Sequence, residues 1–177
     1  ASDVYKRQNL TFLIITTLLI SCNNNLIKKW ENYDESNEIK MNSENENKRL
    51  QFKRIQSISN DKNQLINGFE KEIFNFLKNE YDFVKKLVHE KSIPEIQKSV
   101  IDGKLTYYKL SLFYLTRIYL IEFDQEQYLN SIISINRNIL KEAKNKDKIK
   151  NTEIYSLHGI PILLKDNIGF EAVSYTH

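Results

Sequence analysis

A lysine follows a short apolar stretch in "SLHGIPILLKDNI", residues 156–168 of this 177-residue chain. A lysine amine can take a proton from a hydroxyl nucleophile only when the amine is neutral, and burial among apolar side chains favours the neutral form. From its position alone, Lys165 is expected to be a solvated surface charge, because most lysines lie at the protein surface. Asp166 would point to the opposite face of a strand, where we expect its carboxylate to hydrogen-bond the backbone. The alternative is that Lys165 is a buried, neutral lysine that acts as a base.

The residues before this lysine predict the element that positions it. Ile160, Ile162 and Leu164 alternate with Pro161 and Leu163, which predicts a short strand buried on both faces. Because proline cannot donate to a sheet ladder, it belongs near the start or at the edge of the strand. In α/β sheets catalytic groups gather at the carboxyl ends of strands, where this lysine would lie.

Helices are predicted ahead of that strand. Apolar residues recur at spacings of three and four between Ile66 and Val88, which predicts one amphipathic helix. Ser92 and Glu95 have the spacing of a capping box, with Pro94 in the first turn of the helix that they begin.

Three further elements complete the predicted order. Gly103 is a natural stop for the helix that begins at Ser92, and Thr106 can cap the next one. The apolar stripe of that helix consists of Leu110, Phe113, Tyr114, Ile118 and Ile121. Residues 129–135, "LNSIISI", predict a short strand, and residues 136–150 predict a polar helix. The inward side chains of this polar helix are those of Ile139, Leu140 and Ala143.

Three segments between residues 92 and 171 occur in a familiar order. They are "SIPEIQKSVIDGKLTYYKLSLFYLTRI", "LNSIISINRNILKEA" and "LHGIPILLKDNIGFE". Together they resemble the N-terminal part of the amidase signature family, and the last segment is similar to its "LHGIP-LKDN" signature. The resemblance implies an α/β fold. Here it would comprise the N-terminal helical part and the first strand of a mixed-sheet domain, truncated and so mostly helical.

The resemblance also implies a Ser–cis-Ser–Lys triad in which Lys165 is the lysine. The family places both serines downstream, in a Gly- and Ser-rich segment that residues 166–177 do not contain. We therefore expect an amide-bond hydrolase acting on a small-molecule amide, with this chain as an inactive fragment of it. No cofactor is expected, and no metal either, because His89, His158 and His177 share no spacing that suggests a site.

The single cysteine, Cys22, follows the apolar run "NLTFLIITTLLIS" at residues 9–21. A membrane span needs about 20 apolar residues, so this run better suits the core of an export signal. Residues 19–22 resemble a bacterial lipobox, in which the cysteine is lipidated and becomes the mature N-terminus. We expect an exported protein of the bacterial cell envelope that is lipid-anchored to a membrane through Cys22. The alternative is a buried helix that holds a buried cysteine.

The predicted organisation has four parts. Residues 1–22 contain adaptor-like residues and the lipoprotein signal, 23–64 a polar flexible tether, 65–171 the N-terminal part of the amidase domain, and 172–177 a non-native tail. The first eight and last six residues resemble adaptor read-through, which does not belong in a fold argument. The tether is too polar to offset the entropy of ordering it, and Trp30 within it is expected to be incidental.

Composition excludes some classes of protein function. The net charge of +3 is small and the charged residues are interspersed, unlike the concentrated basic surface of a nucleic-acid binder. One cysteine cannot form an internal disulfide framework. Beside the amidase, the alternative function is a non-enzymatic, mostly helical lipoprotein used for binding or scaffolding.

Overall fold

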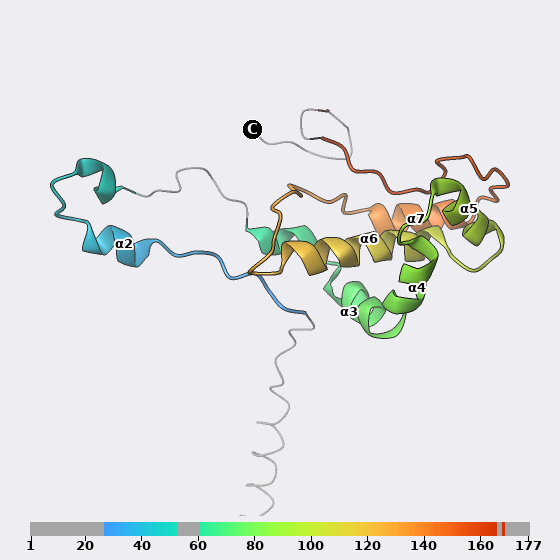
Figure 1. The fold of residues 1–177 in the computed structure, drawn as a ribbon, viewed down its shortest axis with the longest axis horizontal. Coiled ribbons are helices and arrows are strands. Elements are labelled where there is room, and N and C mark those ends of the chain that lie inside the picture. Colours follow the sequence, from blue (N-terminus) through green and yellow to red (C-terminus); the bar gives the residue numbers. More distant parts are fainter. Residues whose placement is uncertain (1–26, 53–60, 166–167, 169–177) are drawn as a thin grey trace, which may run out of the picture.

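A computed structural model describes residues 27–52, 61–165 and 168 of the chain. These residues are mostly helical, with six α-helices, two 3₁₀ helices and no strand among them (Figure 1). In chain order the elements are α2 (Ser36–Met41), η1 (Lys48–Gln51), η2 (Lys62–Ile66), α3 (Glu70–Asn79), α4 (Tyr81–Val88), α5 (Ile93–Ile101), α6 (Tyr107–Glu122) and α7 (Ile139–Asp147).

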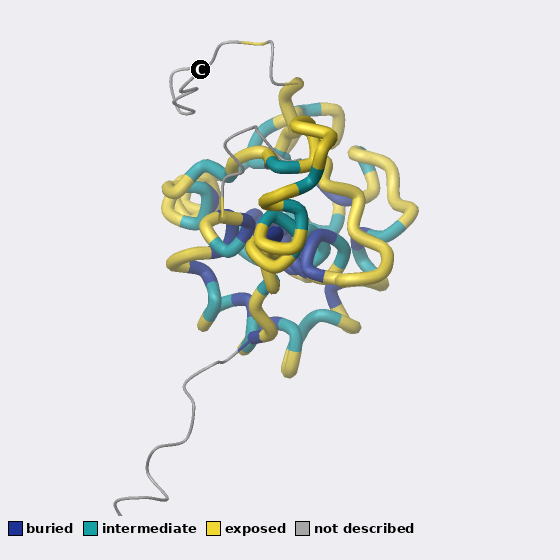
Figure 2. The backbone as a smooth tube through the Cα atoms, turned by 90° about the vertical axis from the view of Figure 1, so that its left-hand side faces the viewer, coloured by how far each residue is buried: buried dark blue, intermediate teal, exposed yellow. Residues whose placement is uncertain are grey.

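Helix α6 is the centre of the helical body, and α3, α4 and α7 pack against it. Residues 110–113 are four consecutive buried positions, which requires cover on every side because neighbouring helical residues point in different directions. The buried backbone accordingly gathers in the middle of the molecule (Figure 2). The amino-terminal half of α6 packs with α4, α5 and α7, and its carboxyl-terminal half packs with η2, α3 and Ile27.

The predicted helix boundaries around α5 and α6 are confirmed. The Glu95 carboxylate accepts hydrogen bonds from the backbone N–H and the hydroxyl of Ser92, at 2.9 and 2.7 Å. Gly103 follows α5 with φ +73°, a conformation that favours glycine. The Thr106 hydroxyl accepts from the backbone N–H of Lys109 at 3.1 Å and caps α6.

The single helix predicted between Ile66 and Val88 is wrong. The structure has a short 3₁₀ helix followed by α3 and α4, which are separated at Glu80, where φ is −130°. No glycine or proline marks this break, and the apolar spacing continues across it. Tertiary packing explains it, because the ring of Tyr81 stacks on Phe113 of α6, with 5.5 Å between the ring centroids.

Neither predicted strand forms among the residues that the structure describes. Residues 129–135 and 160–164 run in extended or irregular conformations. The expectation that Ile160–Leu164 is buried on both faces is wrong, since Ile162 is 64% and Leu163 74% exposed. A strand needs a neighbour to pair with, and within the described ranges residues 162–164 make no backbone hydrogen bond.

Part of the tract expected to be a tether lies on the helical body. Ile27 is buried, and the backbone N–H of Lys28 donates to the Tyr119 hydroxyl at 2.9 Å. Trp30, expected to be incidental, packs edge-to-face on Tyr128 with 4.7 Å between the ring centroids. Isolated apolar residues in a polar tract can therefore still dock. None of the helices described here is long and apolar enough to cross a membrane.

Candidate functional site

An apolar groove of about 870 Å³ runs beside α6 and ends near the predicted catalytic lysine. One wall consists of residues 131–136, another of residues 160–165, and Leu115 and Ile118 of α6 line it as well. Most lining side chains are isoleucines and leucines. Such a surface suits an apolar ligand or a further packed element of a protein.

Lys165 lies exposed at the end of one groove wall. In the described part of the chain its amine makes no hydrogen bond or ion pair, while its backbone carbonyl accepts from the N–H of Ile168 at 3.0 Å. The burial expected of a general-base lysine is therefore not found here. Its neighbour Asp166 lies outside the described residues. The catalytic role of Lys165 stays a prediction.

The turn that precedes this lysine is fixed by a buried amide. Gln97 of α5 is fully buried, and its Nε2 donates to the carbonyl oxygens of Ser156 at 2.7 Å and His158 at 2.9 Å. The hydroxyl of Tyr107 donates to Gln97 Oε1 at 2.7 Å. Asn151 Nδ2 lies 3.2 Å from the same oxygen and extends this network. Gln97 could not be identified from the sequence, because the two carbonyl groups that it holds are about sixty residues away.

Gly159 packs directly on the ring of Tyr107. A Cβ atom added to Gly159 would lie 2.4 Å from the nearest ring carbons, and its φ is +70°. The ring of His158 meets the same tyrosine edge-on, with 5.3 Å between centroids. The histidine and the glycine of "LHGIP" thus lie on α6. Of the other two histidines, His89 ends α4 and His177 lies outside the described residues.

Helix α6 and this turn are joined through the end of α7. The Asp147 carboxylate accepts from the backbone N–H groups of Tyr107 at 2.7 Å and Tyr108 at 3.1 Å. A carboxylate is favourable at the positive amino-terminal end of a helix. His158 Nε2 also lies 3.3 Å from the carbonyl oxygen of Lys146. The first turn of α6 therefore carries several of the contacts that hold residues 151–160.

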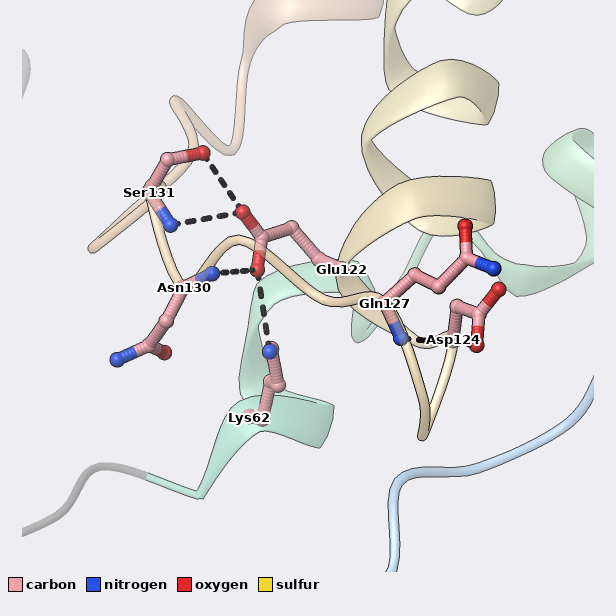
Figure 3. Close-up of polar contacts among 6 residues, drawn as sticks. All are labelled: Lys62, Glu122, Asp124, Gln127, Asn130 and Ser131. Atoms are coloured by element: carbon pink, nitrogen blue, oxygen red, sulfur yellow. Dashed lines mark hydrogen bonds and ion pairs between the residues drawn. The ribbon is translucent and has the colours of Figure 1, made fainter.

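A second buried polar cluster surrounds Glu122 at the other end of α6 (Figure 3). One carboxylate oxygen accepts from the Ser131 N–H at 2.8 Å and its hydroxyl at 2.7 Å, and the other accepts from the Asn130 N–H at 2.9 Å. Lys62 Nζ makes an ion pair with Glu122 at 3.0 Å and lies over the rings of Trp30 and Tyr128. This cluster joins three distant parts of the chain.

The pKa of Glu122 reflects two opposing effects. Burial raises it, because removing a carboxylate from water disfavours the charged form. The hydrogen bonds from Ser131 and the charge of Lys62 outweigh burial and hold the pKa below its ordinary value. The cluster has a structural role, since every group around the carboxylate donates a hydrogen bond to it or neutralises its charge.

The comparisons with known proteins add no relative. No family model, curated protein or solved structure matches the chain. Of the two predicted site residues, Cys22 lies outside the described residues, and Lys165 lines the groove.

Proposed function

We propose that this chain supplies the general-base lysine, Lys165, of a serine amidase that acts on a small-molecule amide. The observation that carries the proposal is the segment "LHGIPILLKDN", which resembles the amidase signature. The packing of Gly159 and His158 on the helical body supports the proposal, because it fixes the turn from which residues 160–165 leave that body. The mixed sheet and both serines would come from a segment that follows Lys165.

The proposed reaction follows from the chemistry of the three groups. The neutral lysine takes a proton from the relay serine, which takes the proton of the nucleophilic serine as its oxygen attacks the amide carbon. The carbon–nitrogen bond breaks, the departing nitrogen receives the proton, and an ester to the serine remains. Water then attacks this ester by the same proton relay, which releases the acid and restores the serine.

Two substitutions of Lys165 test this role in the complete enzyme. Lys165→Ala should lower turnover by more than the factor of about 10² to 10⁴ typical of a lone general base, because triad members act as a unit. Lys165→Arg should be nearly as damaging, because a guanidinium stays protonated and cannot accept the proton. The measurement is hydrolysis of a simple aryl amide, with circular dichroism to check the fold.

The matched control is Lys150→Arg, at another exposed lysine that lies outside the groove lining. It should leave turnover unchanged. Near-normal turnover of Lys165→Arg would mean that this lysine is a solvated surface charge and that the resemblance fails at its central residue. Residues 1–177 alone should hydrolyse no amide, because they lack the Gly- and Ser-rich segment that would carry both serines.

We also propose that Cys22 is lipidated and anchors an exported protein to a membrane of the bacterial cell envelope. The motif at residues 19–22 carries this proposal. Expression in a bacterium that processes lipoproteins, followed by mass measurement of the mature N-terminus, tests it. An unprocessed chain with an unmodified cysteine would contradict it, and Cys22→Ser provides the unlipidated control.

The second candidate is a helical lipoprotein that binds or scaffolds another molecule. The exposed apolar groove favours it, because such a surface can dock a ligand without any chemistry. Reading the gene past the codon for Glu171 separates the candidates. A following Gly-Gly-Ser-Ser-Gly type of segment supports the amidase, and a stop codon there supports the binding protein.

A further inference from the structure

We propose that Gln97 and Tyr107 are positioning residues for the arm, residues 160–165, that carries Lys165. They fix the turn from which the arm leaves the helical body. The catalytic consequence of this proposal rests on the proposed function, whereas the structural role of the two residues does not. Neither residue touches the lysine, and each would act through the turn at Ser156–Gly159.

The hydrogen bonds require an amide at position 97. Its Nε2 has two hydrogens, and both are used on the carbonyl oxygens of Ser156 and His158. Its Oε1 accepts from the Tyr107 hydroxyl, which fixes the orientation of the amide. A glutamate here would place carboxylate oxygens against two carbonyl oxygens. Because the site is fully buried, each lost partner would leave an unsatisfied polar group.

The ring of Tyr107 fixes the turn in a second way. Gly159 approaches the ring so closely that no other side chain fits between them. The amide of Gln97 holds the carbonyl oxygen just before this glycine, so the turn is held from two directions. Pro161 follows two residues later and limits the backbone of the arm further.

The length of the arm makes the turn consequential. Lys165 lies six residues after Gly159, which is a reach of about 20 Å in extended conformation at roughly 3.3 Å per residue. A rotation of about 10° at the turn would move the lysine by about 3.5 Å over that reach. A displacement of about 1 Å can already cost a factor of about 10² in rate. Because residues 162–164 pair with no strand in the described structure, the position of Lys165 there depends on the rigidity of the turn.

Nuclear magnetic resonance of the full chain tests the structural part. One α proton of Gly159 points at the Tyr107 ring and should be shifted upfield by its ring current. Gln97→Met keeps the size of the side chain but removes both donors, and it should move this resonance toward its value in an unstructured peptide. Tyr107→Phe keeps the ring but removes the hydroxyl, and it should move the resonance in the same direction by less.

The matched control is Tyr108→Phe, next in α6, whose hydroxyl makes no hydrogen bond among the described residues. It should leave the Gly159 resonance in place. If Gln97→Met unfolds the chain, Tyr107→Phe decides alone. An unchanged Gly159 resonance in every folded variant would overturn the proposal.

Kinetics of the complete enzyme test the catalytic consequence. Gln97→Met should lower kcat by about 10-fold or more with little change in KM, because the base is misplaced while the ligand surface is intact. The pH profile of kcat should keep its shape, since the base is still a lysine. If Gln97→Met moves the Gly159 resonance but kcat is unchanged, the positioning role is wrong. If the complete enzyme hydrolyses no amide while the resonance behaves as expected, the proposed function is wrong. The structural role of Gln97 and Tyr107 at the turn is then still supported.

Discussion

At the scale of single residues, Gly159 has two separate reasons to be a glycine. Its φ of +70° is unfavourable for any residue with a Cβ atom, and that atom would overlap the ring of Tyr107. Gly103 shares only the first reason, since its φ is +73° and a Cβ atom there would meet nothing within 4 Å. The two positions therefore separate backbone strain from steric overlap.

Substitution of both glycines should give unequal losses of stability. Gly103→Ala should lower the free energy of unfolding by about 1–2 kcal/mol from backbone strain alone. Gly159→Ala should lower the free energy of unfolding by about 1–3 kcal/mol more than Gly103→Ala does, because overpacking forces the ring and the turn apart. Urea unfolding followed by circular dichroism measures both. Equal losses would show that the turn moves away from the ring at no cost.

Glu122 makes stability depend on pH in one direction. Its pKa is lowered in the folded state, so between that value and the ordinary glutamate pKa of about 4.3 the unfolded state binds more protons. The stabilisation is complete above the ordinary value and is lost as the pH falls through the folded value. The other carboxylates are common to the wild type and a Glu122 variant, so their effects cancel in the difference.

We expect Glu122→Gln to cost about 1–3 kcal/mol at pH 7, because it leaves Lys62 without its counter-charge. The difference from wild type should shrink as the pH falls below the ordinary glutamate pKa and then through the lowered folded-state pKa, because the wild-type carboxyl then becomes protonated too. Urea unfolding at each pH measures it, with the exposed Glu126→Gln as a control that stays near wild type throughout. A difference that is constant with pH would mean that Glu122 titrates normally.

At the scale of elements, local signals were sufficient where the stabilising contacts are local. The cap residues Ser92 and Thr106 and the stop at Gly103 could be read from the sequence because each acts within a few residues of itself. The break at Glu80 could not, because it depends on packing against α6. The arm could not either, since its alternation indicates a strand whose neighbours the described residues do not include.

The contact between α7 and α6 gives a prediction at this scale. Asp147 lies at the carboxyl end of its own helix, where a negative charge is unfavourable, and at the amino end of α6, where it is favourable. Asp147→Ala should therefore lower the free energy of unfolding by about 1–2 kcal/mol, like the loss of an N-cap. Thermal or urea unfolding checks this. The control is Glu126→Ala, which removes a carboxylate from an exposed loop and should change the free energy of unfolding by no more than about 0.5 kcal/mol.

At the scale of the whole molecule, stability should be concentrated in α6. This helix is covered by three others, whereas the arm has exposed leucines and amides without partners in the described structure. The buried clusters around Gln97 and Glu122 lie toward opposite ends of α6. Neither cluster was predictable from the sequence, because each depends on residues that only the fold brings together.

Hydrogen exchange should reveal this gradient. Amides in the middle of α6 should exchange most slowly, at rates set by global unfolding, and those of residues 162–165 should exchange fast because they lack hydrogen-bonded partners. Mass spectrometry of peptic fragments resolves the two regions. Strong protection of residues 162–165 in the isolated chain would show that the arm finds partners within these 177 residues.

The docking of Ile27 and Lys28 has a consequence for the proposed lipid anchor. Ile27 lies only five residues after Cys22, and at about 3.6 Å per residue this interval spans at most about 18 Å. A lipid on Cys22 would hold the helical body close to the headgroups. A flexible tether of residues 23–64 would instead have let the body move away from them. The bilayer surface would then form one boundary of the space through which any ligand reaches the groove.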